Sequence, residues 1–224
     1  MALFALSDLH LSFSSNKPMD IFGQVWENHH LKILNNWNSK VMEDDVVLIP
    51  GDISWAMKFE EALLDLEFIH NLNGKKVLLK GNHDYWWSSI SKLNSLYEDM
   101  FFLQNNFYSY EDYAICGTRG WINISEDDEK NQKVYNRELI RLRLSLESAK
   151  GYNKKIVIMH YPPITKISVA QEFIDVLKEY KVEKVIYGHI HYDARHICVN
   201  GFVDGIEYIC ASADIINFDP IRIF

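Results

Sequence analysis

Short runs of consecutive apolar residues recur along the chain, and each is followed by a polar cluster. Four or five apolar residues without alternation are typical of a strand that is covered on both faces. The pattern therefore predicts buried β-strands at residues 2–6, 46–49, 77–79, 156–159 and 185–187.

Between these runs, apolar residues recur at helical spacing. The pattern predicts helices over residues 59–72 and 168–180, and a longer one over 18–37, where Pro18 stands at a position that a helix start tolerates. The carboxylates of residues 126–129 follow Ser125, as is typical of a helix start. The β-α-β-α order favours a layered α/β fold.

Residues 101–117 and 196–224 are rich in aromatic and β-branched side chains, with turn signals and no helical period. We expect additional antiparallel strands there, and hence one mixed sheet or two packed sheets. A chain of 224 residues without repeats or linkers fits a single domain over residues 1–224.

Composition narrows the class of protein. Hydrophobic residues make up 48% of the chain, which excludes a disordered polymer. No apolar run is long enough to span a membrane, the first ten residues lack a basic export signal, and the three cysteines form no Cys-x-x-Cys pair. We therefore expect a cytoplasmic protein without disulfides. The net charge of −8 disfavours long nucleic acid as a partner, and the oligomeric state stays open.

Metal-ligand side chains follow every one of the five apolar runs. Ligands collect at the carboxyl ends of strands in α/β sheets, so these side chains are expected to meet in one site. Alone, each cluster has an ordinary explanation: Asp52 could belong to a turn, and Asn82 could cap a helix over residues 85–97. Their joint occurrence favours a metal centre. The clusters are Asp8 with His10, Asp52, Asn82 to Asp84, His160, and His189 with His191.

These blocks, in this order, resemble the signature of the calcineurin-like metallophosphoesterases. The resemblance implies a sandwich of two mixed β-sheets flanked by helices, with two divalent cations bound between the sheets' strand ends. It assigns Asp8, His10 and His191 to one cation, Asn82, His160 and His189 to the other, and Asp52 to both. Such a ligand set suits Mn, Fe, Zn or Co, and we expect Mn²⁺ to serve in vitro.

The resemblance also implies hydrolysis of a small phosphomonoester, phosphodiester or nucleotide by a metal-bound hydroxide. His83 is the motif histidine that is not a ligand, and in similar enzymes it protonates the leaving oxygen. The alternatives are a nuclease of the same superfamily and a scaffold that binds metal without catalysis.

Three blocks of five or six residues resemble an uncharacterised bacterial branch of predicted phosphohydrolases: the segments 51–55, 82–87 and 117–121. Trp55 and Ala56 stand where related protein phosphatases carry a second Asp and an Arg, so protein-phosphatase activity is not expected. The carboxylate that orients His83 must then be Asp84, Asp52 or another group.

Other residues near the blocks have two interpretations each. Arg119 is a candidate phosphate ligand or a member of a structural ion pair. Trp55, Trp86 and Trp87 either form a rim that stacks an aromatic group or pack beneath the loops. The remaining histidines are expected to be surface or interhelical residues: His29, His30, His70 and His196.

Overall fold

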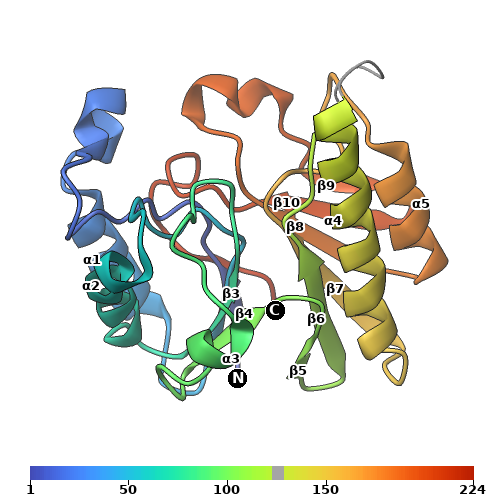
Figure 1. Cartoon of the computed structure of the whole chain (residues 1–224), viewed down its shortest axis with the longest axis horizontal. Coiled ribbons are helices and arrows are strands. Elements are labelled where there is room, and N and C mark those ends of the chain that lie inside the picture. Colours follow the sequence, from blue (N-terminus) through green and yellow to red (C-terminus); the bar gives the residue numbers. More distant parts are fainter. Residues whose placement is uncertain (123–128) are drawn as a thin grey trace.

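The computed structural model describes residues 1–122 and 129–224, which form two β-sheets with helices on their outer sides (Figure 1). The first sheet has the order β11-β1-β2-β3-β4 and the second the order β5-β6-β7-β8-β10-β9. The first comprises β1 (Leu3–Ala5), β2 (Val46–Ile49), β3 (Lys75–Leu79), β4 (Met100–Leu103) and β11 (Ile221–Arg222). The second comprises β5 (Tyr108–Tyr110), β6 (Tyr113–Thr118), β7 (Lys154–Met159), β8 (Lys184–Tyr187), β9 (Gly201–Val203) and β10 (Ile206–Cys210).

Both sheets are mixed. Strands β1 to β4 are parallel and β11 pairs antiparallel with β1. In the second sheet β6, β7, β8 and β10 are parallel, and β5 and β9 are antiparallel to their neighbours. The predicted sandwich of two mixed sheets is thus confirmed, although β4, β6 and β10, expected to be antiparallel, each have a parallel partner.

Helices cover the outer face of each sheet, which explains the unbroken apolar runs. In β2, Val46 and Leu48 pack between the two sheets, whereas Val47 and Ile49 face the helices. Helices α1 (His29–Lys40) and α2 (Phe59–His70) contribute to the core on the first sheet. Helices α4 (Glu129–Ser148) and α5 (Gln171–Glu179) cover the second sheet (Figure 1).

The helix predicted over residues 18–37 is wrong in its first half. Two 3₁₀-helices, η1 (Met19–Phe22) and η2 (Gln24–Trp26), precede α1. Gly23 between them has φ 122°, and Asn28 before α1 has φ 51°; both backbones lie outside the right-handed helical region. Residues 19–26 therefore form a separate irregular segment.

The other helices differ from expectation mainly in extent. Helices α2 and α5 correspond to two of the predicted segments, but only α3 (Ile90–Leu93) forms within residues 85–97. There the chain is turned instead by hydrogen bonds from Tyr85 N–H to the His83 carbonyl and from Trp87 N–H to the Asp84 carbonyl. The helix start predicted at Ser125 lies outside the described residues. A third 3₁₀-helix, η3 (Tyr192–Ile197), follows β8. No helix in the described ranges has the length and apolar character needed to cross a bilayer.

Candidate metal centre

The loops that follow five parallel strands meet at one edge of the sandwich. Asp8, Asp52 and Asn82 follow β1, β2 and β3, while His160 and the His189 to His191 segment follow β7 and β8. Backbone hydrogen bonds hold these loops together: Asp8 N–H donates to Gly51 O (3.0 Å) and His10 N–H to Asp52 O (3.0 Å). Thus the carboxyl ends of strands from both sheets supply one site.

Asp52 lies at the middle of this site. Its Oδ2 atom is 3.3 Å from His160 Nε2, 3.8 Å from His10 Nε2 and 4.0 Å from His83 Nε2. Asn82 Oδ1 lies 2.7 Å from His160 Nε2, and His160 Nδ1 lies 3.0 Å from the Pro50 carbonyl. That carbonyl accepts the Nδ1 proton, which leaves His160 Nε2 directed at Asp52 and Asn82.

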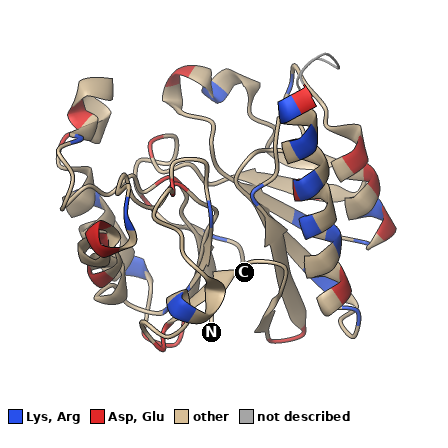
Figure 2. Ribbon diagram, in the orientation of Figure 1, with Lys and Arg blue, Asp and Glu red and all other residues tan. Residues whose placement is uncertain are grey.

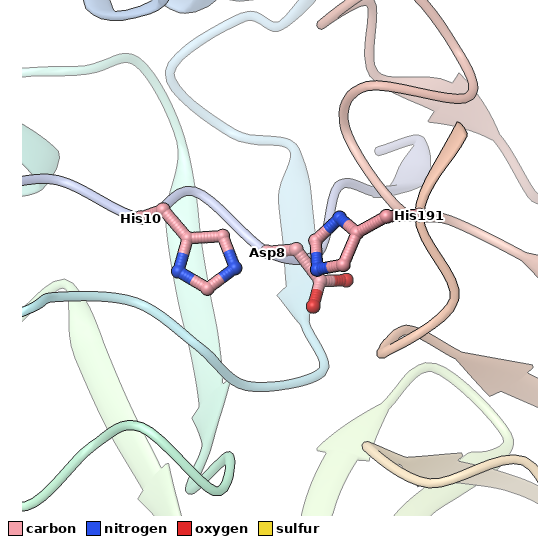
Figure 3. Close-up of side chains that lie close together, drawn as sticks. All are labelled: Asp8, His10 and His191. Atoms are coloured by element: carbon pink, nitrogen blue, oxygen red, sulfur yellow. The ribbon is translucent and has the colours of Figure 1, made fainter. Parts of the chain in front are cut away.

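Two groups of side chains have the spacing of metal ligands. Asp8, His10 and His191 offer ligand atoms that lie within 4.8 Å of one another (Figure 3). Asp8, Asp52 and His160 form the second such group. The first group has the same members as the set that the family resemblance gives to one cation. The second shares His160 and Asp52 with the other set, but brings in Asp8.

His189 lies beside the second group. Its ring centroid is 5.1 Å from that of His160, and its backbone N–H donates to both oxygens of Asp8 at 3.1 Å. All seven side chains that the sequence indicated as ligands are therefore brought to the same edge of the sandwich.

Whether a cation fits the site can be judged from buried polar atoms that make no hydrogen bond. Both ring nitrogens of His10 are buried and have no hydrogen bond within the described part of the chain. Leaving a buried polar group unpaired costs about 1–3 kcal/mol, so such groups are rarely left without a ligand. Carboxylate and imidazole donors together suit a divalent transition metal. These residues therefore fit a divalent cation.

Four residues of the site have a strained backbone. Asp8 (φ 59°), His10 (φ 45°), Asp52 (φ 50°) and His189 (φ 69°) all adopt the left-handed region. For residues other than glycine this costs about 1–3 kcal/mol each and is typical of functional sites, where surrounding structure maintains the strain. The fold therefore holds four of these residues in an unfavourable backbone conformation.

Two glycines lie so close to the site carboxylates that a side chain in their place would overlap them. A Cβ atom on Gly188 would lie 2.1 Å from Ser7 Oγ and 2.4 Å from Asp8 Oδ2. A Cβ atom on Gly81 would lie 2.1 Å from Asp52 Oδ1. Both distances are far below van der Waals contact, so neither position accepts a side chain without displacing a carboxylate.

Charge within the site is balanced between buried acids and histidines. Burial raises the pKa of Asp8, whereas for Asp52 the effect of burial is outweighed by His160, which lowers its pKa. Burial opposes protonation of His160 and His191 too, but Asp52 and Asp214 respectively raise the pKa of each to about 9. Burial lowers the pKa of His189 to about 3 and that of His10 well below its usual value. The buried carboxylates therefore require nearby positive charge, which a cation would also supply.

Sequence reasoning missed Asp214, which contacts a proposed ligand. Its carboxylate oxygens lie 3.2 and 3.3 Å from His191 Nδ1, and one accepts the Tyr192 N–H at 2.9 Å. A carboxylate on one imidazole nitrogen fixes the ring and directs the other nitrogen toward a metal. Asp214 comes four residues after the end of β10, so a polar cluster after a sixth strand was the available signal.

His83 and Asp84 are neighbours with different surroundings. The His83 side chain is 36% exposed, and its backbone N–H donates to Asp52 Oδ1 at 2.8 Å. Burial lowers its pKa. Asp84 is fully buried and accepts hydrogen bonds from the N–H groups of Ile53, Ser54 and Gly81 and from Trp86 Nε1 at 2.7 to 3.1 Å. Burial, and then the charge of Asp52, raise the Asp84 pKa to about 6. Of the carboxylates of Asp52 and Asp84, that of Asp52 faces the His83 ring, with its Oδ2 atom 4.0 Å from His83 Nε2.

Arg119 is held by its neighbours. Its Nη2 atom lies 3.3 Å from Glu138 Oε1, and its guanidinium lies 4.6 Å from the Trp121 ring centroid. These contacts correspond to the ion-pair interpretation of Arg119.

The three tryptophans of the motif blocks divide between the two interpretations. Trp55 stacks on His10 with ring centroids 4.9 Å apart and lies 4.3 Å from the His83 ring. Trp86 is 2% exposed and bonded to Asp84, and Trp87 Nε1 donates to Gln104. Only Trp55 of these three therefore contacts site histidines.

The histidines outside the motifs take ordinary positions. His29 is buried beside Trp26, whose carbonyl lies 3.2 Å from its Nδ1 atom. His70 Nδ1 pairs with Asp99 at 2.6 Å on the surface, and His30 packs edge-on against Phe13. His196 belongs to η3.

The chain is similar in sequence to known proteins. Two curated relatives match: an uncharacterized protein of Methanocaldococcus jannaschii, 30% identical over 87 residues, and the gene 66 protein of Mycobacterium phage D29, 25% identical over 186 residues. The first match covers 37% of this chain and 46% of the archaeal protein, and the second covers 83% and 76%. The chain thus spans less than half the length of the first relative.

Two solved structures share the fold. A protein of unknown function from Aquifex aeolicus superposes with a TM-score of 0.56 and 15% identity over 99% of this chain and 95% of its own. The phosphopantetheinyl hydrolase of Mycobacterium tuberculosis superposes with a TM-score of 0.55 and 14% identity over 92% and 87%. At these identities the likeness concerns the fold.

The family is given by a match that covers most of the chain. The calcineurin-like phosphoesterase model matches residues 1–193, a stretch that begins before Asp8 and ends after His191. It includes all five motif blocks, and it confirms the family predicted from them. The chain belongs to the calcineurin-like phosphoesterase family.

Proposed function

We propose that the chain is a dinuclear metal-dependent phosphohydrolase acting on a small phosphate ester. The observation that carries the proposal is the convergence of two buried carboxylates and four histidines on one edge of the sandwich, including His10, whose ring nitrogens make no hydrogen bond in the described part of the chain. Asp8, His10 and His191 would hold one cation, and Asn82, His160 and His189 the other, with Asp52 between them. When bound, the cations would activate water near neutral pH and neutralise charge on the phosphoryl group.

The chain's own residues would divide the remaining work. His83 is partly exposed and faces Asp52, which supports its role as the acid that protonates the leaving oxygen. Asp84 would act indirectly, because it accepts hydrogen bonds from Ile53 and Ser54 and so joins the loop after β2 to its own loop after β3. Asp214 would orient His191. Arg119 would contribute to substrate binding only if its guanidinium left Glu138 and bound the phosphate group instead.

Charge distribution supports a small substrate over a long nucleic acid. The ribbon in Figure 2 shows that Lys and Arg positions recur along α4, the helix that packs on the outer face of the second sheet. The metal centre lies instead at the strand ends, and the chain as a whole carries a net charge of −8. A polyanion gains affinity from basic residues that line its path, so a nuclease is the less favoured alternative.

We also propose that the protein acts in the cytoplasm.

The test is reconstitution of metal-free protein with Mn²⁺, Fe²⁺, Zn²⁺ or Co²⁺, followed by assays on mono- and diesters and on single- and double-stranded DNA. The proposal predicts turnover of small esters that needs added metal, together with a higher melting temperature when metal is bound. Turnover that survives exhaustive chelation would refute it. Metal binding without hydrolysis of any activated ester would favour the non-catalytic scaffold.

A further inference from the structure

Two separate cavities border the metal centre. The first, here called the Trp55 pocket, has a volume of about 250 Å³ and is lined by Met19, Val25, Trp26, Trp55, His83 and His191 among others. The second, the Ile167 pocket, has a volume of about 300 Å³ and is lined among others by Trp121, Pro163, Ile167, His189, Ile190 and Ile197. The two cavities share no lining residue.

The cavities reach the centre at different ends. The His10 ring lies 5.3 Å from His191 and 5.8 Å from His83, and all three line the Trp55 pocket. His189, which lines the Ile167 pocket, lies 5.1 Å from His160 instead. Asp52 approaches both His10 (3.8 Å) and His160 (3.3 Å). A phosphoryl group beside Asp52 would therefore have one cavity toward each end of the site.

Both cavities suit organic groups of limited size. The Trp55 pocket has aromatic and thioether walls, because Trp55, Trp26 and Met19 line it. Ile167, Ile197 and Pro163 give the other pocket an aliphatic wall. Sites for drug-sized ligands have volumes of about 300–1,000 Å³, so each cavity suits a group such as one ring system or a nucleoside.

A phosphomonoester carries one organic group and would leave one cavity empty. A phosphodiester carries two, one on each side of phosphorus. We propose that the substrate is a phosphodiester with an organic group in each cavity. This inference rests on the proposed phosphohydrolase function and narrows it.

The position of His83 sets the direction of cleavage. His83 lines the Trp55 pocket, so the ester oxygen that receives its proton belongs to the group in that pocket. Water forms the new P–O bond, the P–O bond to the group in the Trp55 pocket breaks, and a proton from water restores His83. The products are the alcohol from the Trp55 pocket and a phosphomonoester whose organic group occupies the Ile167 pocket.

The experiment compares two esters with one leaving group on the Mn²⁺-loaded full chain. Thymidine 5′-(p-nitrophenyl phosphate) is the diester and p-nitrophenyl phosphate the monoester. The wild type should show a kcat/KM at least about tenfold higher for the diester, with thymidine 5′-monophosphate as product. Thymidine 5′-monophosphate should also inhibit at lower concentration than inorganic phosphate.

Variants then test the Ile167 pocket. Ile167→Ala should lower the ratio of diester to monoester kcat/KM about 5-fold, since aliphatic contacts to the thymidine group are lost. Ser168→Trp places a bulky side chain at the wall of the same cavity and should lower the ratio further. Ile140→Ala is the matched control: Ile140 is 59% exposed on α4 and lines neither cavity, so the ratio should stay at its wild-type value.

A preference for the monoester, or a ratio that neither pocket variant changes, would overturn the diester assignment and leave the phosphohydrolase proposal standing. If the metal-loaded protein cleaved neither ester, the proposed function would fail, and the diester assignment with it.

Discussion

Gly188 lies against the Asp8 carboxylate with no room for a side chain. In Gly188→Ala the new Cβ atom would stand 2.1 Å from Ser7 Oγ and 2.4 Å from Asp8 Oδ2, so these atoms must retreat by about 1 Å to restore normal contact. Ser7 and Asp8 are fully buried, so these atoms would have to move within the packed interior. Gly188 does not have a positive φ, so alanine itself fits the backbone and the effect is steric.

The size of the effect follows from this displacement. Overpacking of a buried site costs about 1–3 kcal/mol, and in a chain of this length each kcal/mol lowers the melting temperature by about 2–4 °C. A displacement of about 1 Å at a reacting centre can cost about 10²-fold in rate. We therefore expect Gly188→Ala to melt roughly 2–12 °C lower, to bind less Mn²⁺ and to hydrolyse esters about 100-fold more slowly.

Gly151→Ala provides the control, because a Cβ atom on Gly151 meets nothing within 4 Å and its φ is not positive. That variant should keep its metal content and rate, with a stability change within about 0.5 kcal/mol. Calorimetry, elemental analysis and ester hydrolysis would be measured on both variants. If Gly188→Ala retained two metal equivalents and wild-type turnover, the proposed position of Asp8 beside a cation would be refuted.

Three further substitutions test separate roles. Asp52→Asn removes the carboxylate proposed to touch both cations, so elemental analysis should show both metals reduced; two full equivalents would contradict the bridge. His83→Ala should keep both metals and slow an alkyl ester by roughly 10² to 10⁴, but a nitrophenyl ester of the same class much less, since nitrophenolate leaves without a proton. Equal losses in steady-state rate would instead indicate a role in binding. Asp84→Asn loses a charged acceptor of four hydrogen bonds and should lower the free energy of unfolding by about 2–3 kcal/mol, measured by denaturant titration, while slowing both leaving groups alike. A loss confined to the alkyl ester would mean that Asp84 takes part in proton transfer.

The sequence was most informative where local and tertiary requirements coincide. Val46 to Ile49 is apolar throughout because alternate residues face the opposite sheet and the helices, so the run identified a doubly covered strand. The metal site could also be predicted from residue types that bind metals at the strand ends, because parallel strands bring their carboxyl ends to one edge of the sheet. The five blocks thereby predicted which side chains would meet.

What the sequence did not reveal depends on backbone geometry or on distant partners. The positive φ of Gly23 and Asn28 breaks the helix predicted before α1, and apolar periodicity carries no record of these angles. Asp214 meets His191 only because β10 lies beside β8 in the sheet. Asp84 was one of the candidates to orient His83, yet its carboxylate accepts hydrogen bonds from backbone groups of the loop after β2.

The dinuclear centre can be tested with crystals of the wild-type chain grown with Mn²⁺ and measured on both sides of the manganese absorption edge. Anomalous scattering locates metal ions independently of any assumed ligand. We expect two manganese peaks per chain, one contacted by Asp8, His10 and His191, the other by Asn82, His160 and His189, with Asp52 between them. A single peak, or peaks away from these residues, would contradict the dinuclear centre.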